Sequence, residues 1–452
     1  MSHEILSLLI LAVVFLVATV RGVNMGALAL VAAFIVGLTV YHVEVGDILD
    51  GFPSNLFVTL VGVTYLFALA KNNGTVDWIV HGAVKVVGGR VALVPWAMFV
   101  VCAIVTAIGA VSPAAVAIVA PVGMGFALRY KIHPMLMGMM IVQGATAGSF
   151  SPIGIFGSIT NGVVDRNNLP GNPLFLFATS FVAAFLIALI AFFAFGGRAL
   201  MARGRETTTL AHLDDETEEG MGLTTANQET TEPHSKVEAE RQVKHVTAQR
   251  GDTHKLNTER TLTVIGLVAL IVGALGFNLD VGFTALAVAV TLTLVFPKSA
   301  KGAVEQISWG TVLLVGGIVT YVGLLQNQGV VQWLGDSVAN IGAPLVAALM
   351  ICLIGAVVSA FASTTGIIGA LIPLAVPFLM RGDVSAVGLI AALAISSSVV
   401  DCSPFSTNGA LVVANAEASQ RDGVFRQLMI WGMSIMVIAP LVVWAALVVP
   451  TA

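Results

Sequence analysis

Residues Ser359–Pro377, which read SAFASTTGIIGALIPLAVP, carry four hydroxyl side chains inside sequence that is otherwise apolar enough to span a bilayer. A second stretch, Ser396–Asn408, reads SSSVVDCSPFSTN and has the same mixed character. Polar or interrupted helices at membrane depth are tolerated only where they are buried in protein or line a cavity. In transporters such helices usually build the substrate site. The two stretches therefore predict a membrane protein whose broken helices surround a polar site.

An earlier pair of stretches repeats this plan: Gly109–Pro121 (GAVSPAAVAIVAP) and Ala147–Gly154 (AGSFSPIG). Four pairs of matching residues stand 252 positions apart: Ser112 and Thr364, Pro121 and Pro373, Ser151 and Ser403, Pro152 and Pro404. Two more pairs stand 255 apart: Gly74 and Gly329, Trp78 and Trp333. Six pairs in the same order indicate that the chain is an internal duplication.

Composition defines the class of protein. Of the 452 residues 57% are hydrophobic and only 10% are charged, whereas a soluble domain carries roughly 25% charged residues. The chain is therefore expected to be an integral membrane protein. Its net charge of -4 comes with no basic patch, which argues against nucleic acid as a partner. The sequence also lacks a P-loop, which argues against a nucleotide-driven pump.

Runs of about 20 apolar residues mark spanning helices. The first half has them at about 5–20, 26–42, 55–71, 134–150 with a broken continuation to about 164, and 172–197. The second half has them at about 261–276, 279–297, 310–326, 385–400 with a broken continuation to about 416, and 425–449. A longer double segment lies between the third and fourth spans of each half, at about 93–127 and 343–380. Each is either two crossings or one re-entrant hairpin.

The distribution of charge favours re-entrant hairpins. With five crossings in each half the second half is inverted relative to the first, and 19 of the 21 Lys and Arg residues fall on one side. The other side receives Arg166 and Arg381 and most of the acidic loop residues, such as Glu44, Asp47 and Asp50. By the positive-inside rule the basic side is cytoplasmic, and both termini are outside. The predicted fold is thus all-α, an inverted repeat of 5 + 5 transmembrane helices with two re-entrant hairpins and broken helices.

The predicted organisation has a first inverted repeat over residues 1–200, a linker over 201–260 and a second inverted repeat over 261–452. The linker is rich in Thr, Glu and Asp and has few large apolar residues. Such a composition cannot bury enough surface to order itself. We therefore expect a flexible cytoplasmic tether.

Hairpin tips and helix breaks are the candidate binding elements. A helix that begins at such a point directs free N–H groups toward the centre, and proline there frees a carbonyl group. Ser, Thr, Gly and Pro also serve packing and kinks in membrane helices, but four duplicated sites favour a binding role. We expect the second tip to face Ser403–Asn408, and Ser112 and Ser151 to approach from the cytoplasmic side. The substrate candidates are Ser112, Pro113, Ser151, Pro152, Ser363, Thr364, Thr365, Ser403, Pro404, Ser406, Thr407 and Asn408.

Asp401 is the one acidic residue near membrane depth in this region. An intramembrane acid is by default a functional candidate. Asp401 could ligate a cation, carry a proton, or only cap the broken helix through the N–H of Ser403 or Phe405. Its counterpart in the first half is Ser149, so only one half supplies the acid. The candidates for cation binding or coupling are Ser112, Ser149, Ser151, Ser363, Asp401 and Ser403.

These motifs resemble the ion transporter superfamily, which includes the divalent anion/sodium symporters, and more closely the MatC-type malonate/dicarboxylate carriers. Those symporters have a Ser-Asn-Thr tip ten residues before a proline in both hairpins. Here Ser363-Thr364-Thr365 stands ten residues before Pro373, and Val111-Ser112-Pro113 ten before Pro121. The family's breaks correspond to Ser151-Pro152-Ile153 and Ser403-Pro404-Phe405, while its tip Asn is replaced by Ser112 and Thr364. The resemblance implies a homodimer, an elevator-like movement and a coupling cation, with Na⁺ at the hairpin tips.

The sequence therefore predicts a secondary transporter of the inner membrane that imports a small dicarboxylate, malonate or a C4-dicarboxylate, with Na⁺ or H⁺. The tips and breaks contain no Lys or Arg, so hydroxyls, Asn408, backbone N–H groups and a co-bound cation would hold the dianion. The alternatives are a cation/proton antiporter or an inorganic oxyanion exporter of the same superfamily. A membrane-embedded enzyme is a remote alternative, because Asp401 and Cys402 alone do not provide a nucleophile with its base.

Overall fold

The computed structural model describes residues 3–21, 23–76, 78–79, 82, 90–203, 257–277, 279–339, 343–361, 364–380 and 384–451. Within these ranges every regular element is a helix. The predicted linker lies outside the described residues over 204–256, as do Ser363 at the second tip and Arg381. The all-α prediction is confirmed for the part of the chain that the structure describes.

The two halves have the same order of helices. The first half contains α1 (His3–Arg21), α2 (Met25–Val36, continued by η1, Gly37–Tyr41), α3 (Val45–Leu49), α4 (Ser54–Asn72), η2 (Val91–Leu93), α6 (Val94–Ala107), α7 (Ser112–Arg129), α8 (Pro134–Ser149), α9 (Ile155–Arg166), α10 (Pro173–Ala194) and α11 (Gly197–Ala202). The second half contains α14 (Thr258–Gly276), α15 (Val281–Val295), α16 (Pro297–Ala300), α17 (Trp309–Asn327), α18 (Val330–Ala339), α19 (Pro344–Phe361), α20 (Thr364–Met380), α21 (Ala386–Ser398), η4 (Val399–Cys402), α22 (Thr407–Asn415), α23 (Arg421–Val443), η5 (Trp444–Val448) and η6 (Val449–Thr451).

Helix starts follow local chemistry. The side chain of Asn172 accepts a hydrogen bond from Phe175 N at 3.0 Å, and Asp280 accepts one from Phe283 N at 2.8 Å. Such caps satisfy N–H groups that lack a partner in the first turn of a helix. Apolar runs then extend each helix, and the predicted span at 55–71, for example, is α4 at Ser54–Asn72.

Six described segments are long and apolar enough to cross a bilayer: Ser54–Asn72, Ser112–Arg129, Pro173–Ala194, Trp309–Asn327, Ala386–Asn415 and Arg421–Thr451. Further apolar helices are shorter. Among these is α6, whose 14 residues span about 21 Å, less than the roughly 30 Å of a hydrocarbon core. Multi-pass membrane insertion therefore follows from both length and composition.

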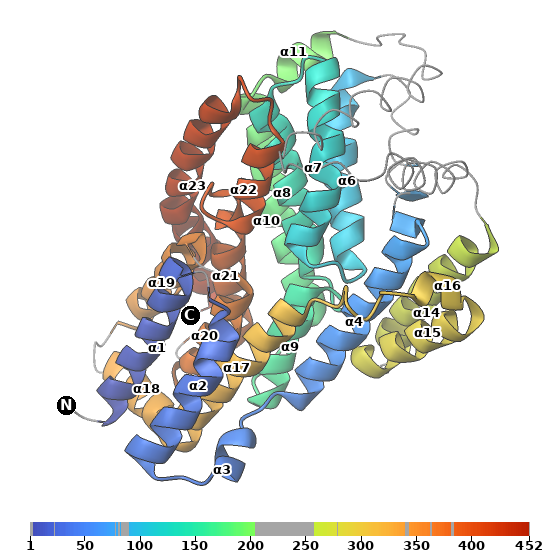
Figure 1. Ribbon diagram of the computed structural model, residues 1–452. Coiled ribbons are helices and arrows are strands. Elements are labelled where there is room, and N and C mark those ends of the chain that lie inside the picture. Colours follow the sequence, from blue (N-terminus) through green and yellow to red (C-terminus); the bar gives the residue numbers. More distant parts are fainter. Residues whose placement is uncertain are drawn as a thin grey trace, which may run out of the picture.

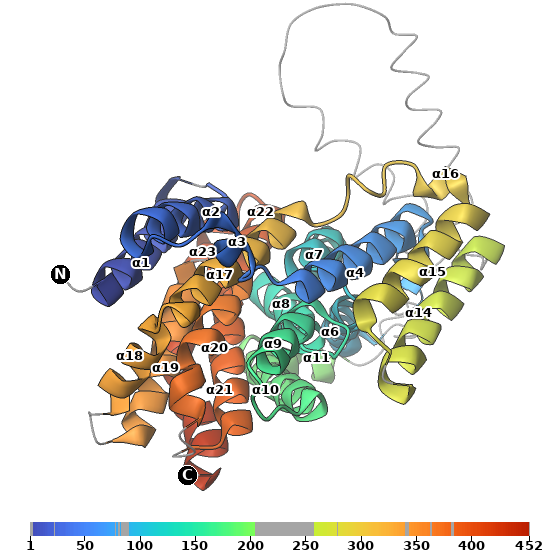
Figure 2. The ribbon, with the colours of Figure 1, turned by 90° about the horizontal axis from the view of Figure 1, so that it is seen from below.

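Helices of the first half pack directly against helices of the second half. Helix α4 of the first half packs on α15 of the second, and α17 of the second packs on α2 of the first. Glycines permit the close approach: a Cβ atom added to Gly62 would lie 2.5 Å from Gly282 O, and one on Gly317 would lie 1.9 Å from Gly26 O. Small residues at such contacts are typical of membrane helices. Figure 2 shows the pairs α1–α2 and α14–α15 on opposite flanks.

The centre of the molecule holds α8 and α21. Every residue of α8 from Met135 to Ser149 is buried, and α21 is buried along nearly its whole length. Both helices end at a predicted break. Helix α11 lies at the top of Figure 1 and α3, with Asp47, at the bottom. The basic end of α10–α11 and the acidic α3 are therefore at opposite ends of the molecule.

Candidate substrate and cation site

The two helix breaks have the same backbone structure. Ser151 and Ser403 each begin a tight turn between the two arms of a broken helix, and the hydrogen bonds around them recur at a spacing of 252 residues. These bonds are Ser151 N to Gly148 O at 3.0 Å and Ser403 N to Val400 O at 2.9 Å, then Gly154 N to Ser151 O at 2.9 Å and Ser406 N to Ser403 O at 3.0 Å. The duplication read from the sequence is thus repeated in local geometry.

A glycine closes each break. A Cβ atom added to Gly157 would lie 2.0 Å from Ser151 O, and one added to Gly409 would lie 2.0 Å from Ser403 O. Real Cβ atoms essentially never approach another atom that closely. Both breaks therefore require glycine in the first turn of the second arm, a requirement that the sequence comparison did not identify.

The break of each half faces the hairpin of the other half. Helix α9, after the first break, packs on α20, and α22, after the second break, packs on α7. The four helix starts at Ser112, Ile155, Thr364 and Thr407 consequently belong to two crossed pairs. This crossing joins helix starts that are 209 and 295 positions apart in sequence, from Ile155 to Thr364 and from Ser112 to Thr407.

At the first tip Ser112 meets the second break. Asn408 Nδ2 donates to Ser112 Oγ at 2.8 Å, although 296 residues separate the two. Both side chains are buried, and Asn408 Oδ1 has no hydrogen-bond partner among the described residues. The junction thus keeps an unsatisfied amide oxygen and a hydroxyl hydrogen that can turn toward a ligand.

At the second tip Thr364 meets Asp401. Thr364 Oγ1 donates to Asp401 Oδ1 at 2.5 Å and lies 2.8 Å from Ser359 Oγ. All three side chains are buried, and Asp401 is 8% exposed. Thr365 is buried beside them, and Ser363 lies outside the described residues. The second tip therefore contacts the break at Asp401, just before the Ser403–Asn408 segment that we expected it to face.

The capping role considered for Asp401 is not adopted. Ser403 N donates to Val400 O, and Phe405 N lies 3.3 Å from Ser403 Oγ, so neither N–H is bound by the carboxylate. Ser406 is the cap of α22: its Oγ accepts from Gly409 N at 3.2 Å and donates to the carbonyl oxygens of Ser403 and Asp401. The Asp401 carboxylate therefore takes no part in the cap and accepts its hydrogen bond from Thr364 of the hairpin.

The other first-half candidates are bound within their own repeat. Ser149 Oγ donates to Ala145 O at 2.7 Å, and Ser151 Oγ donates to Ala107 O at 2.6 Å. Pro113 and Pro152 are partly buried, Pro404 is buried, and Thr407 is exposed. The polar contacts of the candidates therefore concentrate at two junctions, Ser112–Asn408 and Thr364–Asp401.

Ser359, Ser397 and Gln143 are among the buried polar residues that were not candidates. Ser359 and Ser397 lie within the hydroxyl-rich stretches, so their composition pointed to the region but not to the residues. Gln143 stands in an apolar part of α8 with both amide atoms unpartnered in the described structure. No sequence signal marked it.

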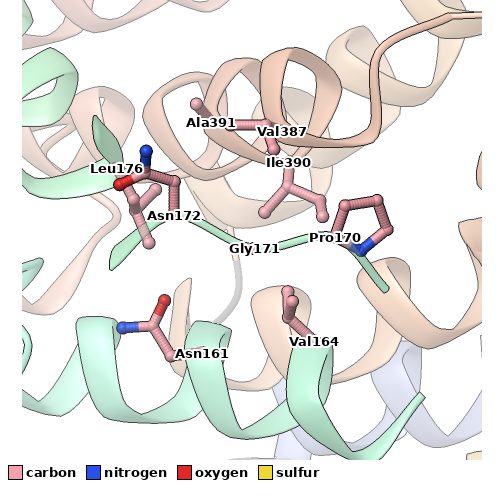
Figure 3. A pocket seen from close by; sticks show the side chains of 9 residues that line it. All are labelled: Asn161, Val164, Pro170, Gly171, Asn172, Leu176, Val387, Ile390 and Ala391. Carbon is pink, nitrogen blue, oxygen red and sulfur yellow. The ribbon is translucent and has the colours of Figure 1, made fainter. Parts of the chain in front are cut away.

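A shallow pocket lies elsewhere, between α9, α10 and α21 (Figure 3). Asn161 and Asn172 are its polar side chains, and Val164, Ile390 and Ala391 are among its apolar ones. None of the predicted substrate residues lines it. The described residues also contain no group of three or more His, Cys, Asp and Glu that could hold a metal ion.

Two family descriptions match the chain. Residues 1–149 match "Dicarboxylate carrier protein MatC N-terminus", and residues 232–449 match "Sodium:sulfate symporter transmembrane region". Together they cover both halves and confirm the resemblance stated above. Both families consist of carriers, so this chain is a carrier and not an enzyme.

Solved structures agree on the fold. The chain is similar to MtrF of Neisseria gonorrhoeae, described as illuminating a class of antimetabolite efflux pumps, with 13% identity, a TM-score of 0.52, and coverage of 92% of this chain and 84% of that one. It is similar to the YdaH transporter of Alcanivorax borkumensis, described as having an unusual topology, with 14% identity, a TM-score of 0.51, and coverage of 89% and 86%. The search of curated proteins found no match.

Proposed function

We propose that this chain, a secondary transporter that resembles the divalent anion/sodium symporters, imports a small dicarboxylate, malonate or a four-carbon dicarboxylate, together with a cation. The observation that carries the proposal is the Ser112–Asn408 junction, where a hairpin tip of one half meets the break of the other. The match of residues 1–149 to a dicarboxylate carrier favours this class of substrate.

The proposed anion site uses neutral donors. Its members are the hydroxyls of Ser112 and Thr407, the Asn408 amide, and the N–H groups at the starts of α7 and α22. Helix N-termini attract anions because their N–H groups and dipoles point at the ligand. An amide at this position is versatile, since rotation about its last bond exchanges the oxygen for an NH₂ group with two donors. Ser151, Ser403 and Ser406, whose hydroxyls hold the breaks in shape, would position this site.

The absence of a basic side chain in the tips and breaks makes cation coupling necessary. Moving one uncompensated charge against the membrane potential costs about 2.3 kcal/mol per 100 mV. A dianion therefore needs co-transported cations to enter a negative-inside cell. We assign this part of the cycle to the Thr364–Asp401 junction and to the hairpin tips, and the match of residues 232–449 to a sodium:sulfate symporter region makes Na⁺ one candidate ion.

For the architecture we propose two inverted repeats of five crossings with α6–α7 and α19–α20 as re-entrant hairpins. The separation of basic from acidic ends supports this arrangement. The linker and the ends of α4 and α10 would then be cytoplasmic in the inner membrane, and both termini outside. A homodimer with an elevator-like movement is the corresponding transport mechanism.

The test is uptake by purified protein in proteoliposomes. Labelled malonate and succinate are supplied with an inward Na⁺ gradient, an inward H⁺ gradient, or neither, in competition with malate, fumarate, citrate and sulfate. We expect concentrative uptake of at least one dicarboxylate that requires one of the two gradients. Uptake that is unchanged when both gradients are removed would contradict cation coupling.

The sulfate arm tests the second candidate. The match of the second half to a sodium:sulfate symporter region favours an inorganic oxyanion as the substrate. Transport of labelled sulfate that no dicarboxylate inhibits would support that candidate and exclude ours.

A further inference from the structure

We propose that Asp401, together with the hydroxyls of Ser359, Thr364 and Ser397, is a proton-binding site and that the coupling ion of this carrier is H⁺. The inference rests on the proposed function, because it names the ion that accompanies the dicarboxylate. Ser359 and Ser397 are assigned to this site for the first time by the contacts below.

A chain of hydroxyls leads to the carboxylate. Ser359 Oγ of α19 lies 2.8 Å from Thr364 Oγ1 of α20, which lies 2.5 Å from Asp401 Oδ1 of η4. Thr364 Oγ1 is also 3.5 Å from Ser397 O of α21. The elements α19, α20, α21 and η4 therefore meet around one carboxyl group, and the hairpin is hydrogen-bonded there to a side chain that can gain or lose a proton.

Ser397 supplies an unused hydroxyl in the same interface. It is 0% exposed, and its Oγ has no hydrogen-bond partner among the described residues. A Cβ atom added to Gly355 would lie 2.8 Å from Ser397 Oγ, and Gly355 is one turn before Ser359 on α19. The free hydroxyl thus stands between α19 and α21, near the start of the hydroxyl chain. It can accept or pass on a hydrogen as the carboxyl group changes state.

Among the described residues, the elements that pack on η4 place no positive charge beside Asp401. The elements packed against η4 are α8, α19, α21, α22 and α23, and the first four contain no Asp, Glu, Lys, Arg or His. In α23 the charged residues stand in its first two turns: Arg421, Asp422 and Arg426. The other titratable groups nearby are the buried thiols of Cys352 and Cys402. An ionised carboxylate without a cationic partner is costly at membrane depth, so binding of a positive ion there is favourable.

The spacing of the oxygens favours a proton over a metal ion. Oxygen ligands surround a metal ion and stand apart from one another around it. Here Thr364 Oγ1 is within hydrogen-bond distance of both Ser359 Oγ and Asp401 Oδ1. Their own hydrogens already hold the cluster together, so one added proton can convert the carboxylate to a neutral acid without rearranging the helices.

The first half lacks the equivalent site. The positions 252 residues before Ser359, Thr364, Ser397 and Asp401 are Ala107, Ser112, Ala145 and Ser149. The duplicated backbone is therefore retained while the acid and two of the hydroxyls are present in one half only. This is expected if one half binds the proton and the Ser112–Asn408 junction binds substrate.

Proton binding would change the link between tip and break. The ionised carboxylate accepts from Thr364, whereas the neutral acid has a hydrogen of its own to donate. A proton taken from the outside water forms the O–H bond of the acid, and the same bond breaks when the proton is released to the cytoplasm. The net negative charge that crosses the membrane with each imported dianion is thereby lowered by one for every proton carried.

The experiment uses the full chain in proteoliposomes that enclose a pH-sensitive dye. Malonate or succinate, whichever is transported, is added at zero membrane potential without Na⁺, and the internal pH is recorded. We expect acidification with the native sequence, and its loss to the level of protein-free vesicles for Asp401→Asn. Asp422→Asn, the same change at an exposed carboxylate, is the matched control and should acidify normally. Asp401→Glu retains a carboxyl group and should restore part of the signal.

The outcomes separate this inference from the proposed function. Substrate uptake that requires Na⁺ and is not accompanied by acidification overturns the proton site and leaves the symport proposal intact. Unchanged acidification by Asp401→Asn also overturns it. No uptake of either dicarboxylate under any gradient overturns the proposed function itself. If Asp401→Asn does not fold, the recording on the native chain with and without Na⁺ still decides the coupling ion.

Discussion

The two junctions between hairpin and break differ in chemistry and in position: Ser112–Asn408 joins the two halves of the chain, whereas Thr364–Asp401 lies within the second half. Ser112 and Asn408 form a junction of neutral groups, whereas Thr364 and Asp401 form one with an acid. The turns at Ser151 and Ser403 have the same hydrogen bonds and need the same glycines. The backbone turns of the two breaks are therefore alike, while the side chains at the two junctions differ.

The shared backbone should be the most sensitive feature. Gly157→Ala and Gly409→Ala each place a Cβ atom 2.0 Å from a carbonyl oxygen, so we expect each to destabilise the protein by about 3 kcal/mol or more, at the upper end of overpacking costs. Thermal unfolding in detergent measures the effect. Gly125→Ala in α7, where a Cβ atom would meet nothing within 4 Å, is the control and should be neutral or slightly stabilising. Equal melting temperatures for all three variants would contradict the geometry of the breaks.

Dicarboxylate uptake should be sensitive to a charge placed at the Ser112–Asn408 junction. Asn408→Asp places a carboxylate against the proposed anion site, and we expect dicarboxylate uptake to fall by roughly 100-fold or more, because a buried unpaired charge costs several kcal/mol. Asn408→Ala should reduce uptake by about tenfold, in line with the roughly 1–3 kcal/mol cost of leaving Ser112 unpartnered. Uptake kinetics over a range of malonate concentrations measure both. If the Asn408→Asp variant has native affinity for malonate, Asn408 is not part of the substrate site.

Moving the acidic side chain from the second half to the first tests whether cation coupling moves with it. The double variant Asp401→Ser with Ser149→Asp keeps the number of acids but places the acid in the first half. We expect no recovery of cation-driven uptake over Asp401→Ser alone, since the first half has Ala107 and Ala145 at the positions that correspond to Ser359 and Ser397. Initial rates of gradient-driven malonate uptake decide the matter. Recovery would show that the two junctions are interchangeable.

The smallest expected difference concerns the serines of the breaks. Ser151 Oγ donates to Ala107 O at 2.6 Å, whereas Ser403 Oγ is only a weak acceptor from Phe405 N at 3.3 Å. Ser151→Ala should therefore cost about 1 kcal/mol, as expected for one net hydrogen bond, and Ser403→Ala less. Differential scanning calorimetry of both variants measures which substitution lowers the stability more. A larger loss for Ser403→Ala would indicate that its hydroxyl has a partner in a ligand.

Much of the architecture could be predicted from the sequence because hydropathy and proline act locally. The break at Ser151-Pro152 and the helix at 55–71 were located to within a few residues. Side-chain pairing was less predictable. Ser112 and Asn408 were both candidates, but only three-dimensional crossing of the halves brings them together. Asp401 was identified by its charge, while its partner depended on the hairpin lying against η4.

Signals that depend on rotamers or on close backbone approach are not visible in a sequence. Ser149 and Ser151 were candidates because of their residue type, yet both hydroxyls point to backbone carbonyl groups. Gly157 and Gly409 looked like ordinary membrane glycines until the carbonyl oxygens beside them were located. Residue type therefore located the region, and packing decided the role of each side chain.

The exchange of helices between the halves has a consequence for biosynthesis. The faces of α2 and α4 that carry Gly26 and Gly62 pack on α17 and α15. These partner helices are synthesised more than 200 residues later. During synthesis the N-terminal helices enter the membrane first, with these faces still turned to lipid. The packing of α2 and α4 is thus completed only after α15 and α17 have been synthesised.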